Sequence, residues 1–170
     1  MKKDHIGQLI KKLKLEPLPD EGGLYSETYR SDLILKKESL PEEYGGGRCI
    51  STAIYYMLTS SPLRVSKLHK IRSDEIYHFY SGDPVALLLL HQDGNSEQVI
   101  LGKDILGGQH VQYIVPCGVW QGSHLLPGGE YALLGTTVSP GFDFKDSTIA
   151  KRNELLKTYP DESALIMKLT

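Results

Sequence analysis

The sequence predicts one all-β domain, a sandwich or barrel, with short helices at both ends. Short β-rich blocks follow one another along most of the chain and alternate with turn signals such as Asp93-Gly94 and Pro127-Gly128-Gly129. Many short strands at regular spacing are typical of these architectures. The chain has 170 residues. A chain of this size buries roughly 70% of its unfolded surface, which suits one domain with a single core.

Residues 1–16 are predicted to form an amphipathic helix, because apolar residues recur there at helical spacing and Pro17 follows them. The β-structure is expected within residues 20–145. Its strands are Leu24–Arg30, Cys49–Leu58, Arg64–Ile71, Glu75–Tyr80, Val85–His91, Gln98–Leu101, Val111–Val115 and Tyr131–Val138, with a further motif strand from Trp120. Residues 146–170 are predicted to be helical over Thr148–Thr158 and Asp161–Met167, with a break at Pro160. Residues 1–170 thus form one domain.

The strand Val85–Leu90 is apolar on both faces. A barrel strand with one solvent-facing side would alternate with polar residues, so something must cover its outer face. Either a terminal helix or a second subunit can do this. A homodimer is the simplest explanation, and we expect one.

Composition excludes several classes of partner. Charged residues make up 24% of the chain and the net charge is −2, so neither nucleic acid nor a membrane surface is expected as a partner. No apolar run is long enough to cross a bilayer, and the lysine-interrupted N-terminus lacks the unbroken apolar region of a signal peptide. The chain has only two cysteines, Cys49 and Cys117, which predicts a reducing, cytoplasmic location.

Two segments carry polar residues at spacings that a plain core does not require. The first runs from His69 to Glu75 and is followed after six residues by Gly82; the second is Pro116-Cys117-Gly118-Val119-Trp120-Gln121. These segments resemble the two motifs of the cupin superfamily, in which histidines and a glutamate converge. His69 and Glu75 match a motif histidine and the glutamate, whereas Ile71 and Gln121 stand where two further histidines occur.

Longer stretches are similar to one branch, the uncharacterised "cupin 5" family of RmlC-like jelly rolls. They include Glu21-Gly22-Gly23, residues 27–31, residues 73–80 and residues 131–142. The resemblance implies an all-β cupin fold, the RmlC-like jelly roll or double-stranded β-helix. It also implies a ligand pocket inside the barrel, and related cupins often form dimers.

The candidate catalytic residues are His69 and Glu75, because a carboxylate beside an imidazole suits an acid–base pair. Strand alternation places Glu75, Tyr77 and Phe79 on one face, and His78 on the other. Arginines are added as candidates to neutralise an anionic ligand. The predicted ligand-binding residues are His69, Glu75, Tyr77, Phe79, Gln121, Ser123, Tyr131, Arg30 and Arg48.

No metal site is assigned, because a cupin metal needs three imidazoles and a carboxylate, and Ile71 cannot ligate. We expect no tightly bound cofactor. A loosely bound divalent ion would have to use His69, Glu75 and Gln121.

Three functions follow as hypotheses. The first is binding of a small organic ligand, carbohydrate-like or acidic, in the barrel. The second, from the resemblance to dTDP-4-dehydrorhamnose 3,5-epimerase, is isomerisation or epimerisation of a keto-sugar with His69 as base; Tyr131 is the nearest replacement for that enzyme's tyrosine. The third is a metal-dependent cupin enzyme.

Overall fold

The computed structural model describes residues 2–170, with the backbone alone for residues 2–4. Strands make up most of the regular structure: β1 (Glu16–Pro17), β2 (Leu24–Arg30), β3 (Ile34–Leu35), β4 (Arg48–Cys49), β5 (Thr52–Thr59), β6 (Val65–Lys70), β7 (Asp74–Gly82), β8 (Val85–Leu90), β9 (Ser96–Leu101), β10 (Gln112–Val115), β11 (Trp120–Leu125), β12 (Tyr131–Ser139) and β13 (Thr148–Ile149). The helices are α1 (Lys2–Leu13), α2 (Arg152–Thr158) and α3 (Ser163–Lys168), with the short 3-10 helices η1 (Lys37–Ser39), η2 (Phe144–Asp146) and η3 (Pro160–Glu162).

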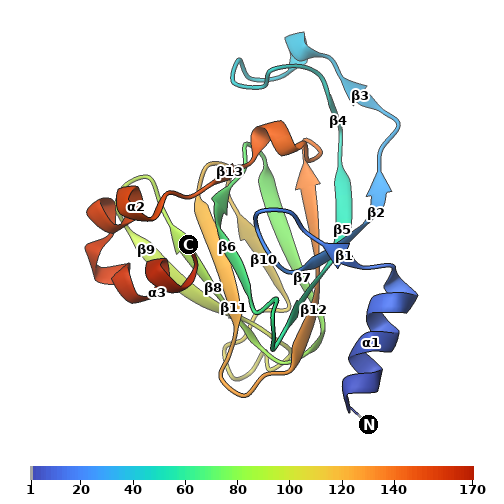
Figure 1. Ribbon diagram of the computed structural model, residues 1–170. Helices are drawn as coiled ribbons and strands as arrows, with labels where there is room; N and C mark the ends of the chain where they lie inside the picture. Colours follow the sequence, from blue (N-terminus) through green and yellow to red (C-terminus); the bar gives the residue numbers. More distant parts are fainter. Residues whose placement is uncertain (1) are drawn as a thin grey trace.

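Two antiparallel sheets face each other and form the barrel (Figure 1). The larger sheet has the strand order β1-β2-β5-β12-β7-β10, and the smaller sheet has the order β13-β6-β11-β8-β9. Neighbouring strands in each sheet are often distant in sequence, as a jelly roll requires. The predicted fold class is therefore confirmed.

Strand alternation puts the core between the two sheets. On β7, Glu75, Tyr77 and Phe79 are buried and point inwards, while Ile76 and His78 lie on the outer face and are half-buried. Tyr77 and Phe79 join the main apolar cluster between the sheets. The predicted alternation of this strand is confirmed.

The C-terminal helices cover the outer face of the smaller sheet (Figure 1). All residues of β8 are buried. Leu88 and Leu90 face outwards and pack in one cluster with Leu155 of α2 and Ile166 of α3. The doubly apolar strand is thus covered within the chain, and inferring a second subunit from it was wrong. The homodimer remains a prediction without that argument.

The segment after the barrel departs in part from the predicted helix over Thr148–Thr158. Its first residues form β13, which pairs with β6 so that Ile149 lies opposite His69. The backbone N–H of Ala150 then donates to the carbonyl of Leu68 at 2.8 Å. Pairing with a sheet edge overrides the helical pattern here, and α2 begins only at Arg152.

The N-terminal helix α1 lies against the outer face of the larger sheet. Its apolar residues, Ile6, Leu9, Ile10 and Leu13, pack around Leu15, Leu24, Met57 and Leu133. Among the described residues no helix is long and apolar enough to cross a membrane.

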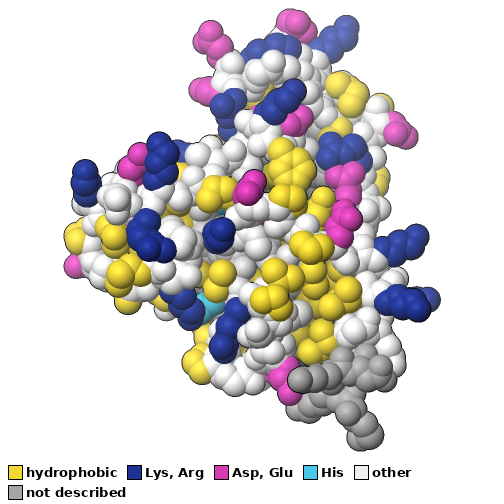
Figure 2. All heavy atoms as spheres, viewed as in Figure 1, with side chains coloured by type: hydrophobic (Ala, Val, Ile, Leu, Met, Phe, Trp, Pro, Cys, Tyr) yellow, Lys and Arg dark blue, Asp and Glu magenta, His cyan; other side chains and the backbone are white. Residues whose placement is uncertain are grey.

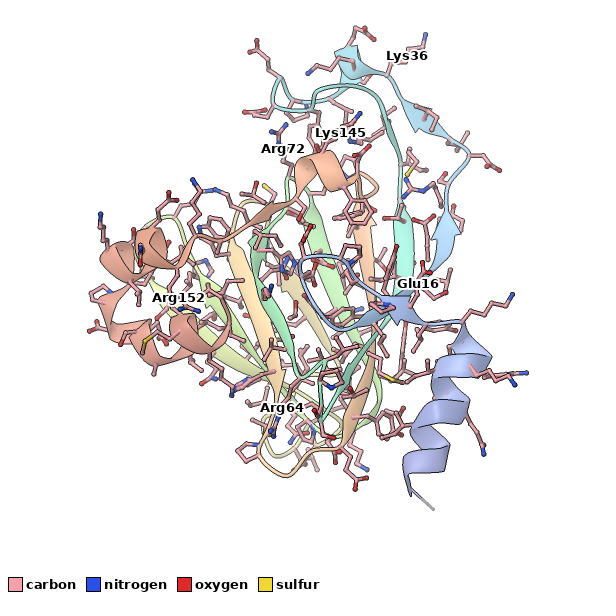
Figure 3. The ribbon with its side chains drawn as sticks, in the orientation of Figure 1. Glu16, Lys36, Arg64, Arg72, Lys145 and Arg152 are labelled. Atoms are coloured by element: carbon pink, nitrogen blue, oxygen red, sulfur yellow. The ribbon has the colours of Figure 1, made fainter. Side chains whose placement is uncertain are left out.

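Residues 31–49 form an arm that projects beyond the barrel, with β3 and β4 paired in a sheet of their own (Figure 1). Two buried side chains attach the arm to the barrel. The hydroxyl of Tyr44 donates to the carbonyl of Arg72 at 2.6 Å. The guanidinium of Arg48 makes two bonds, of 2.6 and 2.7 Å, to the carboxylate of Asp146 in η2. Figure 3 shows the labelled Arg72 close to η2.

Candidate functional site

A cavity of about 260 Å³ opens between the two sheets at one end of the barrel. Its lining comes from both sheets and from two loops. The lining residues are Leu18, Glu21, Tyr25, Glu27, Arg30, Thr52, Ile54, Tyr56, His69, Ile71, Glu75, Tyr77, Thr136, Val138, Phe142 and Phe144. Figure 2 shows hydrophobic side chains gathered beside acidic and basic ones on the face that the segment 14–23 crosses.

The ring of His69 has a defined tautomer. Its Nδ1 lies 2.8 Å from the carbonyl oxygen of Lys67. A carbonyl can only accept, so Nδ1 carries a proton, and in the neutral ring Nε2 is left as the acceptor. His69 is only 3% exposed and lines the cavity.

A second carboxylate, that of Glu21, faces this imidazole. Its Oε2 lies 3.6 Å from Nε2 of His69, and its Oε1 accepts from the hydroxyl of Ser66 at 2.8 Å. Glu21 is carried by the segment before β2, which crosses between the two sheets; the labelled Glu16 marks its start in Figure 3. The backbone carbonyl of Glu21 also accepts from the N–H of Lys67 at 2.8 Å.

Two glycines allow this segment to approach the sheets. Gly22 has φ +99°, and a Cβ there would lie 2.6 Å from the carbonyl oxygen of Val65. Gly23 has φ +73°, and a Cβ there would collide with the ring of Tyr56. The predicted turn at these residues therefore also delivers a cavity residue. Sequence reasoning missed Glu21, because the only signal near it is the Glu-Gly-Gly stretch, which by itself indicates a turn.

Glu75 is held in the cavity wall by Gln121 of β11. The amide Nε2 of Gln121 donates to Oε2 of Glu75 at 2.7 Å. Burial raises the pKa of the Glu75 carboxyl above its ordinary value; neighbouring His69 opposes the shift, and Glu21 adds to it. Gln121 is fully buried and does not itself line the cavity. Its Oε1 has no hydrogen-bond partner within the described residues.

The tyrosine hydroxyls of the cavity differ in their bonding. That of Tyr56 donates to the carbonyl of Gly22 at 2.9 Å. The side chain of Tyr77, whose residue is 3% exposed, lines the cavity, but its hydroxyl makes no hydrogen bond within residues 2–170. Burial raises the pKa of both tyrosines well above the ordinary value. Both are therefore protonated at neutral pH and can donate.

An ion pair stands on the rim. The guanidinium of Arg30 makes two bonds, of 3.0 and 2.7 Å, to the carboxylate of Glu27. It also donates to the backbone carbonyl of Phe142, with both contacts at 3.2 Å. Arg30 thus fixes the loop that carries Phe142 and Phe144, and its charge is already matched.

The structure brings together only some of the predicted ligand residues. His69, Glu75, Tyr77 and Arg30 line the cavity, and Gln121 supports Glu75. The other predicted residues, Arg48, Phe79, Ser123 and Tyr131, do not line it.

Each of these four has a structural reason to lie elsewhere. Arg48 is buried in its ion pair with Asp146. Phe79 is part of the apolar core between the sheets. Ser123 is fully buried on β11 beyond Gln121. Tyr131 begins β12 at the far end and contacts the ring of His5 in α1.

The residues present do not fit a cupin metal. Ile71 lines the cavity in place of a ligand, and the amide of Gln121 turns its Nε2, a donor, toward Glu75. Within the described part of the chain no cluster of three or more His, Cys, Asp or Glu residues could hold a metal ion. The donor set at this position therefore suits hydrogen bonding to an organic molecule better than coordination of an ion.

Two facing antiparallel sheets with an internal cavity and the retained His69 and Glu75 define a cupin-fold protein. The chain belongs to the cupin superfamily family DUF985, whose model matches residues 7–150. It is 37% identical over 147 residues to an uncharacterised protein of Saccharomyces cerevisiae, in a match that covers 81% of this chain and 71% of that protein.

Solved structures with the same fold are found as well. A hypothetical protein from Leishmania major has a TM-score of 0.85 and 33% identity, with 96% of this chain and 97% of that one covered. A protein from Shewanella oneidensis has a TM-score of 0.81 and 31% identity, with 96% and 95% covered. Oxalate decarboxylase of Bacillus subtilis has a TM-score of 0.52 and 13% identity, with 92% of this chain and 37% of that one covered. At this identity the similarity concerns the fold alone.

Proposed function

We propose that this protein binds a small, carbohydrate-like organic molecule in the cavity. The observation that carries the proposal is the hydroxyl of Tyr77, a residue that is 3% exposed and lines the cavity, for which no hydrogen bond is found within residues 2–170. A cavity-lining hydroxyl without a protein partner is available to bond a ligand or water.

The size and composition of the cavity support this class of ligand. Its volume of about 260 Å³ lies just below the roughly 300–1,000 Å³ of pockets for drug-sized molecules. Polar groups such as Glu75 and Thr136 are combined with apolar and aromatic walls such as Ile54 and Phe142. A sugar ring offers both hydroxyl groups and apolar C–H faces, and so matches such a mixed surface.

The charges of the lining favour the carbohydrate-like alternative over the acidic one. Three lining residues are glutamates, Glu21, Glu27 and Glu75, and within the described residues Arg30 is the one lysine or arginine that lines the cavity. Arg30 is already paired with Glu27. An anionic ligand would meet two carboxylates without a free cation, which is unfavourable in a buried site.

Tyr77→Phe tests the proposal, because it removes the unpartnered hydroxyl and keeps the ring. We expect it to weaken binding of a neutral monosaccharide or amino sugar about 2- to 10-fold, the value of one neutral hydrogen bond, without loss of stability. Titration calorimetry with a panel of monosaccharides, amino sugars, uronic acids and sugar phosphates measures this. Tyr113→Phe, whose hydroxyl bonds Glu97 away from the cavity, is the matched control. Binding only of the anionic members would contradict the proposal.

The geometry of His69 favours one further candidate, proton transfer on a carbonyl sugar. Because Nδ1 is held by the carbonyl of Lys67, the neutral ring offers Nε2 to the cavity as a base, and the carboxylate of Glu21 would stabilise the resulting imidazolium. In this reaction Nε2 of His69 takes a proton from the carbon next to the ketone. Tyr77, which lines the cavity as Tyr131 does not, would then donate its own hydroxyl proton to the same carbon, and proton exchange with water would restore the neutral imidazole and the tyrosine hydroxyl.

This candidate predicts exchange with solvent. In D₂O, deuterium should appear next to the carbonyl of a keto-sugar such as fructose or a nucleotide-linked 4-keto-sugar. His69→Ala should reduce the rate about 10²- to 10⁴-fold, the usual contribution of a general base. His78→Ala, which changes a histidine on the outer face of β7, is the control. Absence of exchange in the wild-type protein, with binding retained, would leave a binding protein and reject the isomerase.

A further inference from the structure

We propose that the ligand carries a primary ammonium group, which sits beside Glu21 and His69 in the part of the cavity that Glu75 also lines. This inference rests on the proposed binding function and narrows its ligand class from carbohydrate-like molecules in general to those with an amino group.

The first argument is the direction of the hydrogen bonds in this part of the cavity. Nε2 of the neutral His69 ring is an acceptor, because Nδ1 carries the proton. Oε2 of Glu21, only 3.6 Å away, is also an acceptor when the carboxylate is ionised. Two acceptors that face each other at this distance need a donor, which is either a proton on Nε2 itself or an N–H of the ligand.

The second argument is the number of donors required. The carboxylate of Glu75, which already accepts from Gln121 through Oε2, lines the same cavity as Glu21 and His69. The lining thus presents three acceptor groups, which are Nε2 of His69 and the two carboxylates. It also offers the hydroxyl of Tyr77 as an unused donor. An ammonium group has three N–H donors and no acceptor, whereas a ligand hydroxyl has one donor. The ammonium group therefore matches this part of the cavity better.

The third argument is charge. With Glu27 matched by Arg30, Glu21 and Glu75 remain as buried or half-buried carboxylates opposite a single imidazole. Buried charges are stable when they are paired. Tyr25, Tyr56 and Tyr77 also line the cavity, and aromatic faces attract ammonium groups. A cation from the ligand would complete the pairing.

The test compares matched compounds that differ in one group. Glucosamine is paired with glucose and N-acetylglucosamine, galactosamine with galactose, and cyclohexylamine with cyclohexanol. We expect each amine to bind at least about tenfold more tightly than its uncharged partners at pH 7, because charge-assisted hydrogen bonds are roughly twice as strong as neutral ones. Titration calorimetry on the full chain measures the ratio.

The variant Glu21→Gln tests whether the carboxylate of Glu21 causes the preference for amines. Gln keeps the shape and an oxygen for Ser66 but removes the charge, so the ratio of amine binding to binding of the uncharged partner should fall to about twofold or less. Asp20→Asn removes the same charge from the neighbouring, exposed position and should leave the preference unchanged.

The outcomes separate the two proposals. Equal binding of amines and alcohols, or a preference that survives Glu21→Gln, overturns the ammonium group and leaves the binding function standing. Failure of every compound, charged and uncharged, overturns both. A preference that Asp20→Asn abolishes as strongly as Glu21→Gln also overturns the ammonium group, since a long-range effect of net charge would then explain it.

Discussion

Replacing Arg48 by Met is expected to lower the free energy of unfolding by about 3–5 kcal/mol, the largest loss we expect from any single change outside the core. The reason is the carboxylate of Asp146, which is 5% exposed and would stay buried without its partner. Arg48 also donates to the carbonyls of Gly46 and Gly47 at 3.1 and 2.9 Å, so those bonds would be lost as well. Urea denaturation of the wild type and the variant measures the difference.

Two further variants show whether the ion pair is the cause. Arg72 lies 4.0 Å from the same carboxylate but has an exposed side chain, so Arg72→Met should cost less than about 1 kcal/mol. The double variant Arg48→Met, Asp146→Leu removes both charges and should recover most of the loss, because an apolar pair of similar size often replaces a buried ion pair without cost. A double variant as unstable as Arg48→Met would reject the explanation.

Replacing Glu75 by Gln is expected to weaken ligand binding about 10- to 100-fold, which corresponds to the loss of one hydrogen bond to a charged group. The amide is nearly isosteric, and its oxygen can still accept from Nε2 of Gln121. Binding of glucosamine or, if it binds more tightly, glucose is measured by calorimetry. Unchanged binding would remove Glu75 from the site.

The same substitution should raise stability at neutral pH. Burial raises the pKa of Glu75 above its unfolded value of 4.5, so the folded state holds this proton longer than the unfolded state. The contribution of Glu75 to stability is therefore greatest below about pH 4.5 and falls as the pH rises through the folded pKa. Glu75→Gln cannot lose a proton, so the difference in stability between variant and wild type should grow from pH 4 to pH 7. A difference that stays constant over this range would contradict the raised pKa.

A residue that binds a ligand at the expense of stability is common in functional sites. Glu75 would fit that description if both results are obtained. Its carboxylate would then be costly to the empty fold, and a bound ligand would offset part of that cost.

The fold was largely predictable because its signals are local. The period of two along β7 put Tyr77 and Phe79 inside, and the apolar run of β8 indicated burial on both faces. What covered that run was not predictable, since an apolar face looks the same beneath a helix and beneath a second subunit.

The site was less predictable because its contacts are long-range. His69 and Glu75 were found through motif spacing, whereas Glu21 reaches Ser66 across 45 residues from a segment with no strand pattern. Arg48 was predicted to bind a ligand because an arginine can neutralise an anion, but its true partner, Asp146, lies 98 residues away in the chain. Single-sequence patterns carry little information on such pairings.

The C-terminal helices also affect how far the folding unit extends. The family match ends at residue 150, but the backbone N–H of Leu68, in the middle of β6, donates to the carbonyl of Leu169 at 2.7 Å. The boundary of the matched family region and the boundary of the hydrophobic core are thus nearly twenty residues apart. A chain trimmed to the family region would keep every cavity residue and still present a leucine-rich sheet to solvent, which makes aggregation its main hazard.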